Sequence, residues 1–587
     1  MWQMMGTFIG KSWKIGATLI LGCLAFLFWW VKYPSALAFH EQFQLFLFDG
    51  GYFAERMAQP GGLGRWLAEF LVQFYNNPLF GAVIIAILYI LIQRLCWVLI
   101  RRQCRADASL SLAYLLSFIP VLMVWYLMGD TNTMLSFVVS FLLALVAMWA
   151  WPRGKWSQVA FVVLGLPLLY WFIGPAMLMV ALYVGLRLFT EKDTHGALYA
   201  AAVIVYAVAV VLASGLLAPY PLSSLFRGID YHRFPKEVPP VMVATMALTA
   251  LLPFVASWLC NKVKLRGPYV AAVTTMLLLT LWYVVSPSYD AKTYGLIDYD
   301  FLVRTGQWNA ILDKASKDHL DLPMSVCATN LALGMTNQMG ERLFGFYQHG
   351  VQGMFPGFER NFTSSLLNGE VYFQLGMVNT AQRFAFETME MLPNNNKSCR
   401  AVKRLVETNL IGGHYKVAEK YISMLEKTMF YRKWAKRTRQ LLGNEQTINN
   451  DPVYGKLRRR TYNEDFLFSE TEQDRMVGQL FLRDSTNTLA MQYLMAYPLL
   501  SCDLDKVVQY LPVVQQKANY FPSLCQQALV MAYAGRRQTP PEGLVAPQVI
   551  NDFAQFSRIV SNEGPHSPSL DVYRHTFWYY ILQNQKQ

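Results

Sequence analysis

Long apolar runs fill the first half of the chain and are missing from the second half. A helix of about 20 residues can cross about 30 Å of hydrocarbon, so we predict nine membrane spans, of which the fifth and sixth are short. They lie at residues 13–31, 79–100, 109–128, 132–151, 157–173, 175–190, 196–218, 240–260 and 267–286. Only Gly174 and Pro175 separate the fifth and sixth runs, so a re-entrant pair or two strongly tilted helices remain alternatives there.

The second half has helix-length segments separated by glycine turns, which predicts an all-α fold for the whole chain. The clearest unit is "NGEVYFQLGMVNTAQRFAFETMEMLP", from Asn368 to Pro393. Its small, aromatic and terminal residues have the spacing of a helical hairpin: Gly369, Tyr372, Gly376, Ala381, Ala385 and Pro393. Similar turns occur at Gly306 and Gly413. This half resembles a degenerate tetratricopeptide-repeat solenoid, which implies either a surface for a protein or peptide partner or a cap on the membrane half.

We therefore expect two domains, a multi-pass membrane domain at 1–290 and a helical repeat domain at 291–587. With 54% hydrophobic and only 15% charged residues, the chain is not one ordinary soluble domain. The basic clusters near Lys11, Arg101, Arg153, Arg187 and Lys262 fall in alternate loops. The positive-inside rule then places the amino terminus in the cytoplasm of a bacterium and the repeats in the periplasm.

The net charge of +13 is explained by that loop pattern, so no nucleic-acid partner is expected. The eight cysteines include no CxxC spacing, and no phosphate-binding, dinucleotide or metalloprotease motif occurs. We therefore expect no metal and no cofactor.

The first outer loop, residues 32–78, is amphipathic rather than simply polar. Two stretches are amphipathic, Phe39 to Phe48 and Leu63 to Tyr75, and in the second one Trp66, Leu67, Phe70, Leu71 and Phe74 follow helical spacing. Such stretches are typical of helices that rest on the lipid surface. They would form a shelf that carries carboxylates at the outer face of the membrane.

This layout resembles the polytopic type C glycosyltransferases, which use polyprenyl-phosphate-linked sugars. The matching features are Glu41 shortly after the first span, Asp49 beyond it, an amphipathic helix around Trp66 and an outer soluble domain. The resemblance implies catalytic roles for Glu41 and Asp49, with a carboxylate taking the proton of an acceptor hydroxyl. The family usually pairs two acids, whereas His40 precedes Glu41 here, so no metal ligand is assigned. The arrangement also resembles an uncharacterised family of bacterial polytopic proteins.

A phosphate leaving group needs positive charge, and the outer loops supply it. The candidate substrate-binding residues are His40, Arg56, Arg65, Arg227, Asp230, His232 and Arg233. Two plainer interpretations remain open. Glu41 would then be a solvated position on an interfacial helix, and the loop at 219–240 would be a proline-braced connector.

The resulting hypothesis is an inner-membrane glycosyltransferase that moves a sugar from a polyprenyl-phosphate carrier to an extracytoplasmic acceptor. The alternative is a non-enzymatic envelope scaffold that presents periplasmic repeats to partner proteins.

Overall fold

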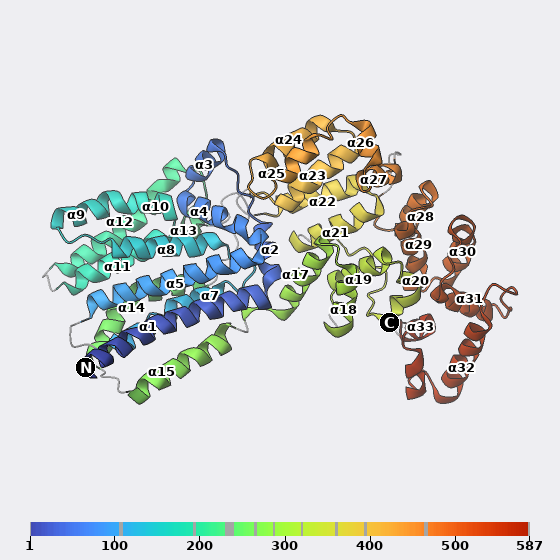
Figure 1. The fold of residues 1–587 in the computed structure, drawn as a ribbon, viewed down its shortest axis with the longest axis horizontal. Coiled ribbons are helices and arrows are strands. Elements are labelled where there is room, and N and C mark those ends of the chain that lie inside the picture. Colours follow the sequence, from blue (N-terminus) through green and yellow to red (C-terminus); the bar gives the residue numbers. More distant parts are fainter. Residues whose placement is uncertain are drawn as a thin grey trace. The chain divides into compact units, whose positions relative to one another are not determined.

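In the computed structural model of the chain, the described residues form helices joined by loops (Figure 1). The structure describes residues 2–584 except 105–109, 192–194, 229–239, 263–266, 286–287, 319–320, 358–361, 393–395 and 463–467. Within these ranges there is no β-strand. The predicted all-α class is confirmed.

The chain forms two compact units. The first consists of Met1–Tyr294 together with Leu392–Cys399 and Met424–Lys433. The second consists of Gly295–Met391, Arg400–Ser423 and Trp434–Gln587. Two short segments from the carboxy-terminal half of the sequence therefore belong to the unit that holds the apolar helices.

Six helices among the described residues of the first unit are long and apolar enough to cross a membrane. They are Trp13–Lys32 (most of α1, Trp2–Leu27, with η1, Phe28–Lys32), Pro78–Gln103 (α5), Leu110–Leu127 (α6, Leu110–Leu116, and α7, Ile119–Leu127), Lys155–Ile173 (α9, Lys155–Ala160, η3, Phe161–Gly165, and α10, Leu166–Ile173), Gly196–Leu217 (α12) and Pro240–Cys260 (in α14, Pro240–Lys262). Shorter apolar helices lie at Leu135–Trp149 (α8), Ala176–Thr190 (α11) and Thr274–Tyr283 (in α15, Gly267–Thr280, and η4, Leu281–Val285).

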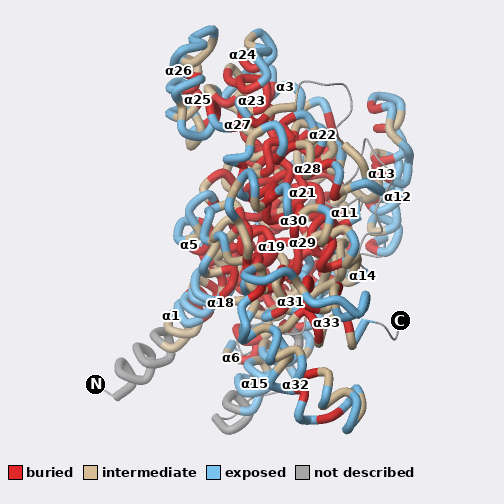
Figure 2. The backbone as a smooth tube through the Cα atoms, turned by 90° about the vertical axis from the view of Figure 1, so that its right-hand side faces the viewer, coloured by how far each residue is buried: buried red, intermediate tan, exposed pale blue. Residues whose placement is uncertain are grey.

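Apolar side chains cover the outside of these helices as well as their core. Helix α12 is exposed along much of its length (Figure 2), and Leu198, Val205, Leu212 and Leu216 have exposed fractions of 66%, 68%, 47% and 90%. A long row of exposed aliphatic residues is unfavourable in water and favourable in hydrocarbon. This surface fits a membrane protein.

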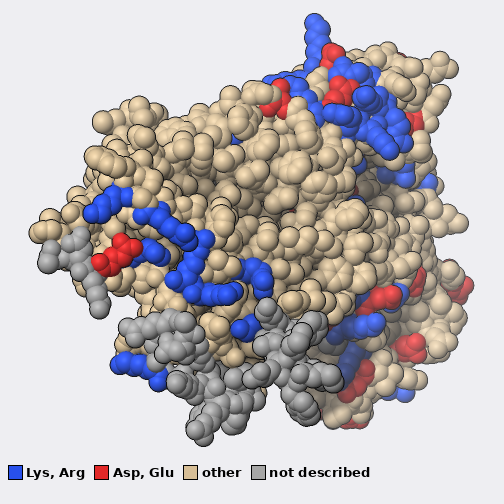
Figure 3. Space-filling view, turned by 60° about the vertical axis from the view of Figure 1, so that its left-hand side comes forward, with Lys and Arg blue, Asp and Glu red and all other residues tan. Residues whose placement is uncertain are grey.

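The loops of the first unit gather at two ends. At one end, hydrogen bonds join Lys14 Nζ to the Leu110 carbonyl (3.5 Å), Arg102 Nη1 to the Trp149 carbonyl (2.5 Å) and Ser257 Oγ to the Gln103 carbonyl (2.6 Å). At the other end, they join Gly61 N to the Trp171 carbonyl (2.9 Å), the Tyr170 hydroxyl to the Leu225 carbonyl (3.0 Å) and the Tyr294 hydroxyl to the Gly129 carbonyl (3.1 Å). Lys14 and Arg102 belong to the first end. Figure 3 shows a band of Lys and Arg at the left of the view, with acidic side chains beside it.

The 32–78 loop folds into α2 (Pro34–Glu41), α3 (Gly50–Met57), α4 (Gly62–Val72) and η2 (Gln73–Asn76). Every residue of α2 after Pro34 is buried, and so are Leu45 and Phe46. The expectation that the stretch from Phe39 to Phe48 rests on lipid is therefore wrong over most of its length, because protein covers these side chains.

A close contact between two glycines anchors the loop. Gly61 has φ 81° and Gly174 has φ 63°, the left-handed region that glycine adopts at little cost. A Cβ placed on Gly61 would lie 3.4 Å from the Gly174 backbone. In addition, Trp171 Nε1 donates to the Met57 carbonyl at 2.8 Å. The turn between α10 and α11 thus holds the start of α4.

The second unit is a series of short helices, several paired across glycine turns. They are α17 (Ala291–Arg304), α18 (Trp308–Asp318), α19 (Pro323–Met335), α20 (Met339–Arg342), η5 (Leu343–Gly345), α21 (Phe362–Leu375), α22 (Val378–Glu390), α23 (Cys399–Ile411), α24 (Tyr415–Glu426), α25 (Arg432–Arg439), α26 (Glu445–Asn450), α27 (Tyr454–Arg460), α28 (Gln473–Arg483), α29 (Thr488–Leu500), α30 (Leu504–Ala518), α31 (Ser523–Gly535), α32 (Pro547–Glu563), η7 (Pro568–Tyr573) and α33 (Phe577–Asn584). α17, α23, α24 and α25 also include residues of the first unit.

The pair α21 and α22 shows how these hairpins form. Gly376 makes the turn with φ 98°, and a Cβ on Gly369 would lie 3.2 Å from the Phe384 Cβ. The Tyr372 and Phe384 rings stack at 5.4 Å between centroids. The small residues thus allow close approach of the two helices, as the spacing predicted.

Candidate functional site in the first loop

Glu41, the last residue of α2, lies in the interior of the first unit. Its exposed fraction is 3%. Cys399 Sγ donates to both carboxylate oxygens at 3.2 Å, and the Tyr431 hydroxyl donates to them at 3.0 and 3.2 Å. A buried carboxylate is stable only where hydrogen bonds replace its hydration, and here a thiol and a phenol do so. In this packing Glu41 does not face solvent, where an acceptor hydroxyl would arrive.

His40 packs beside Glu41 as a neutral ring. Its exposed fraction is 4%, and its ring lies near those of Phe39 and Phe43. Burial lowers its pKa from 6.5 to about 4, and the charge of Asp130 opposes the shift. No group of three or more His, Cys, Asp or Glu suited to a metal occurs among the described residues.

Asp49 occupies a different environment from Glu41. It precedes α3, its side chain is 39% exposed, and it forms an ion pair with Lys427 at 3.1 Å. The backbone just before Asp49 forms hydrogen bonds with segments 392–399 and 424–433, which also supply the partners of Glu41. Phe48 N donates to the Lys427 carbonyl at 2.8 Å, and Leu45 N donates to the Lys397 carbonyl at 2.9 Å. The two acids that the resemblance groups together therefore have separate partners.

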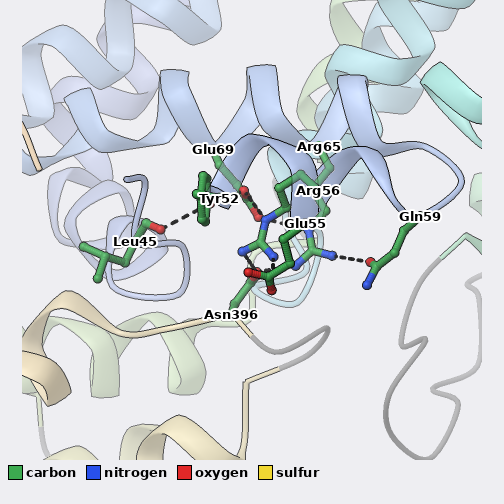
Figure 4. Close-up of polar contacts among 8 residues, drawn as sticks. All are labelled: Leu45, Tyr52, Glu55, Arg56, Gln59, Arg65, Glu69 and Asn396. Atoms are coloured by element: carbon green, nitrogen blue, oxygen red, sulfur yellow. Dashed lines mark hydrogen bonds and ion pairs between the residues drawn. The ribbon is translucent and has the colours of Figure 1, made fainter. Parts of the chain in front are cut away.

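Arg56 and Arg65 converge on one buried carboxylate, that of Glu69 (Figure 4). Arg56 Nε lies 2.8 Å from Glu69 Oε2, and Arg65 Nε lies 3.0 Å from Oε1. The side chains of Arg56, Arg65 and Glu69 are 4%, 12% and 1% exposed. Tyr52 also donates to Glu69. Two guanidinium groups thus share one carboxylate within the protein interior.

Asn396 closes this network from the distant segment 392–399. Its Oδ1 accepts from Arg56 Nη2 at 3.2 Å and from Arg65 Nη2 at 2.5 Å. Arg65 Nη1 also donates to Gln59 Oε1 at 3.0 Å. The donors of the two arginines are therefore directed at protein acceptors, which is how buried guanidinium groups are usually satisfied.

The electrostatic environment of the network keeps Arg56 protonated opposite Glu69. Burial acts to lower the pKa of Arg56, but Glu69 and Tyr52 outweigh it and the pKa is raised. Burial, together with the positive charge of Arg56, lowers the pKa of Arg65. The negative charge of Glu69 raises this pKa but does not fully compensate. Burial and the neighbouring Glu69 raise the pKa of Tyr52, which keeps its phenol protonated as a donor.

The remaining candidates lie apart from these residues or cannot be placed. Arg227 ends α13 (Leu222–Arg227), is half-buried, and is followed by Gly228 with φ 72°. Asp230, His232 and Arg233 lie outside the described residues. The structure therefore brings together Arg56 and Arg65, and separately His40 and Glu41.

Sequence reasoning missed four residues that complete these sites. Glu69 had a signal, because Arg65 and Glu69 are spaced i, i+4 on one helix. Cys399, Tyr431 and Asn396 had none, since Cys399 and Tyr431 follow Glu41 by 358 and 390 residues. Their role depends entirely on how the chain folds back.

The second unit holds its own buried ion pairs between α17, α21 and α23. Arg400 Nη1 lies 2.7 Å from Asp300 Oδ1, and Arg404 Nη2 lies 2.7 Å from Glu370 Oε2. Burial acts to raise the pKa of Glu370, but Arg404 and Arg400 outweigh it and the pKa is lowered. These contacts join neighbouring helices and thus stabilise the stack of hairpins.

Comparison with known proteins gives one match. A family model described as "Family of unknown function (DUF6057)" matches residues 11–584. No curated protein and no solved structure matches the chain. Because the family match covers nearly all of the sequence, the chain belongs to the family of unknown function DUF6057.

Proposed function

We propose that this protein is a non-enzymatic scaffold of the bacterial inner membrane. Nine apolar helices cross the bilayer, and the helical hairpins of the second unit act as a degenerate tetratricopeptide-like solenoid that presents a surface to partner proteins in the periplasm. The state of Glu41 carries this proposal. The carboxylate that the glycosyltransferase resemblance makes catalytic is 3% exposed and accepts hydrogen bonds from Cys399 and Tyr431.

The position of these donors explains what the first loop does in a scaffold. Segments 392–399 and 424–433 belong to the first unit and contact the 32–78 loop through Glu41, Asp49 and Arg56. The 32–78 loop thus holds these two distant segments within the first unit, and we call this set of contacts the joint. The buried polar groups make that joint specific, because mispairing would leave a charge unsatisfied.

The two sets of loops support nine crossings. Hydrogen bonds place the loops near Lys14, Arg102 and Trp149 at one end, and those near Gly61, Gly129 and Leu225 at the other. In the proposed arrangement of nine crossings, each of the nine apolar helices runs from one end to the other. The basic end faces the cytoplasm by the positive-inside rule, which leaves the 32–78 loop and the repeats outside.

The topology is tested with one pair of cysteine variants. Gln440 and Arg153 are both exposed, Gln440 after α25 and Arg153 at the basic end. Cys23, Cys104 and Cys502, the free cysteines that are not buried, are first changed to serine. A membrane-impermeant maleimide applied to intact spheroplasts should then label Gln440→Cys and leave Arg153→Cys unlabelled until the membrane is broken. The reverse labelling would invert the topology and remove the periplasmic assignment.

The scaffold role is tested by complementation of a deletion strain. Glu41→Gln keeps the size of the side chain and one acceptor oxygen, so a scaffold with this change should complement in cells that express it to normal abundance. Phe386→Glu combined with Val417→Glu changes two exposed apolar positions, 42% and 44% exposed, on α22 and α24 and should abolish complementation. Val572→Glu, at a position 86% exposed, is the control and should have no effect.

The type C glycosyltransferase remains a second proposal because two guanidinium groups gather in the 32–78 loop. Arg56 and Arg65 share the buried carboxylate of Glu69, and the second acid beside Arg56, Glu55, is 52% exposed, so a phosphate can compete with it for Arg56. Catalysis by Glu41 would require Cys399 and Tyr431 to move away. Loss of a cellular glycan in Glu41→Gln at unchanged protein abundance would favour this enzyme over the scaffold.

A further inference from the structure

Helix α25 carries a dense group of exposed cations. Its sequence is RKWAKRTR, and Ala435 and Thr438 form its buried side. The exposed residues are Arg432, Lys433, Lys436 and Arg437, and Lys416 and Lys420 are exposed on the preceding helix α24. Figure 3 shows a dense cluster of Lys and Arg at the upper right, with acidic side chains among them.

Acidic groups neutralise only the edges of this surface. Arg439 pairs with Glu419 at 2.9 Å, and Lys427 pairs with Asp49 at 3.1 Å. In the part of the chain that the structure describes, Lys433, Lys436 and Arg437 form no ion pair. A net positive field therefore remains over the outer side of α25.

The spacing of these cations disfavours the helix in isolation. Arg432 and Lys436 are four residues apart, and so are Lys433 and Arg437. Like charges at i, i+4 lie next to one another on a helix and repel, which destabilises it. An anionic partner would relieve this repulsion.

The start of α25 lies beside the membrane end of a candidate span. The Lys427 carbonyl accepts from Phe48 N at 2.8 Å, and the Phe430 ring lies 5.8 Å from that of Phe74. Phe74 is in η2, and Pro78 soon after it begins α5. The first cations of α25 therefore follow directly on residues that pack at the end of α5.

We propose that the basic face of α25 binds the headgroups of anionic phospholipids. Lys and Arg side chains bind phosphate, and each cation near an anionic membrane raises its affinity for the surface about fivefold. Met429, 44% exposed, adds an apolar side chain just before the helix, as in other interfacial anchors. The inference rests on the proposal that α5 crosses a bilayer.

The test uses the full-length protein in nanodiscs of phosphatidylcholine, with and without phosphatidylglycerol. Gln440→Cys, placed just after α25, is labelled with an environment-sensitive dye after the partly exposed Cys23, Cys104 and Cys502 are changed to serine. The test variant is Lys433→Gln, Lys436→Gln and Arg437→Gln. The matched control removes the same charge at exposed sites on α18, α30 and α32: Lys317→Gln, Lys517→Gln and Arg558→Gln.

Phosphatidylglycerol should shift the dye emission to the blue in the parent protein and the control, and high salt should reverse the shift. Loss of three cations should lower the affinity of the test variant for the anionic surface about a hundredfold, so its dye emission should show almost no shift. The proposal is overturned if phosphatidylglycerol has no effect on the parent, or if the control loses as much as the test variant.

Two further outcomes separate other causes. A shift produced by soluble polyphosphate over phosphatidylcholine discs, with none from phosphatidylglycerol, would overturn lipid binding in favour of a soluble polyanion. A chain that fails to enter nanodiscs would instead refute the membrane-spanning assignment of α5, on which the inference rests.

Discussion

Replacing Glu69 with glutamine should destabilise the first unit more than any change of an exposed acid in the same loop. Glutamine keeps the size of the side chain but removes the negative charge that faces Arg56 and Arg65 at 2.8 and 3.0 Å. Their side chains are only 4% and 12% exposed, so water cannot take the place of the carboxylate.

The structure sets the size of the effect. Two unit charges about 4 Å apart attract by about 4 kcal/mol at an effective dielectric constant of about 20. Measured losses on breaking a buried ion pair are about 3–5 kcal/mol, since desolvation offsets part of the attraction. We expect Glu69→Gln to lower the free energy of unfolding by about 3–5 kcal/mol.

Glu55→Gln is the matched control. Glu55 also lies near Arg56, at 3.4 Å, but its side chain is 52% exposed. An exposed pair contributes less than about 1 kcal/mol. Both variants and the parent would be unfolded by denaturant titration in mild detergent, followed by near-ultraviolet circular dichroism.

A double-mutant cycle makes the test specific. If Arg56 and Glu69 interact directly, Arg56→Gln combined with Glu69→Gln should cost less than the two single changes added together, by more than about 0.5 kcal/mol. The reasoning fails if Glu69→Gln costs no more than Glu55→Gln, or if the two changes are additive.

Three further predictions concern the same loop. Burial holds the pKa of folded His40 at about 4, against 6.5 in the unfolded chain, so the unfolded chain binds the proton first as pH falls. The free energy of unfolding should be full above pH 6.5 and fall by about 3 kcal/mol towards pH 4. His40→Phe should remove this part of the pH dependence in denaturant titrations. Tyr431→Phe removes a donor to the buried carboxylate of Glu41 and should cost about 1.5–3 kcal/mol in the same assay, and a loss below about 0.5 kcal/mol would contradict that role. Gly61→Ala forces alanine to φ 81° against the Gly174 backbone and should lower the free energy of unfolding by about 1–3 kcal/mol, whereas Gly50→Ala, with nothing within 4 Å of its added Cβ, should be near neutral.

The predicted features that the structure shows are those that depend on neighbouring residues in the sequence. A membrane helix must satisfy its backbone within one continuous apolar run, so α5 and α12 could be located from the run alone. The turn at Gly376 could be located because its left-handed φ of 98° favours glycine. Spacing on one helix also links Arg65 to Glu69.

The candidate site was harder to predict because the state of a polar side chain depends on what surrounds it. In the sequence, Glu41 has the same appearance whether it faces lipid headgroups, solvent or protein. The segments that carry Asn396, Cys399 and Tyr431 give no local sign that they join the first unit. Arg56 and Arg65 were therefore expected to await a phosphate, whereas in the structure they hold Glu69 and Asn396.

The sequence by itself determined the helical class, the positions of the apolar helices and the alternation of basic loops, because hydrophobicity and charge act over a few turns of chain. Only the tertiary structure decided that the loop acids differ, with Glu41 buried at 3% exposure and Asp49 paired at the surface. The physical reason is solvation. A carboxylate keeps its water or exchanges it for hydrogen bonds according to which distant segments fold over it, and here two segments from the far half of the chain do so.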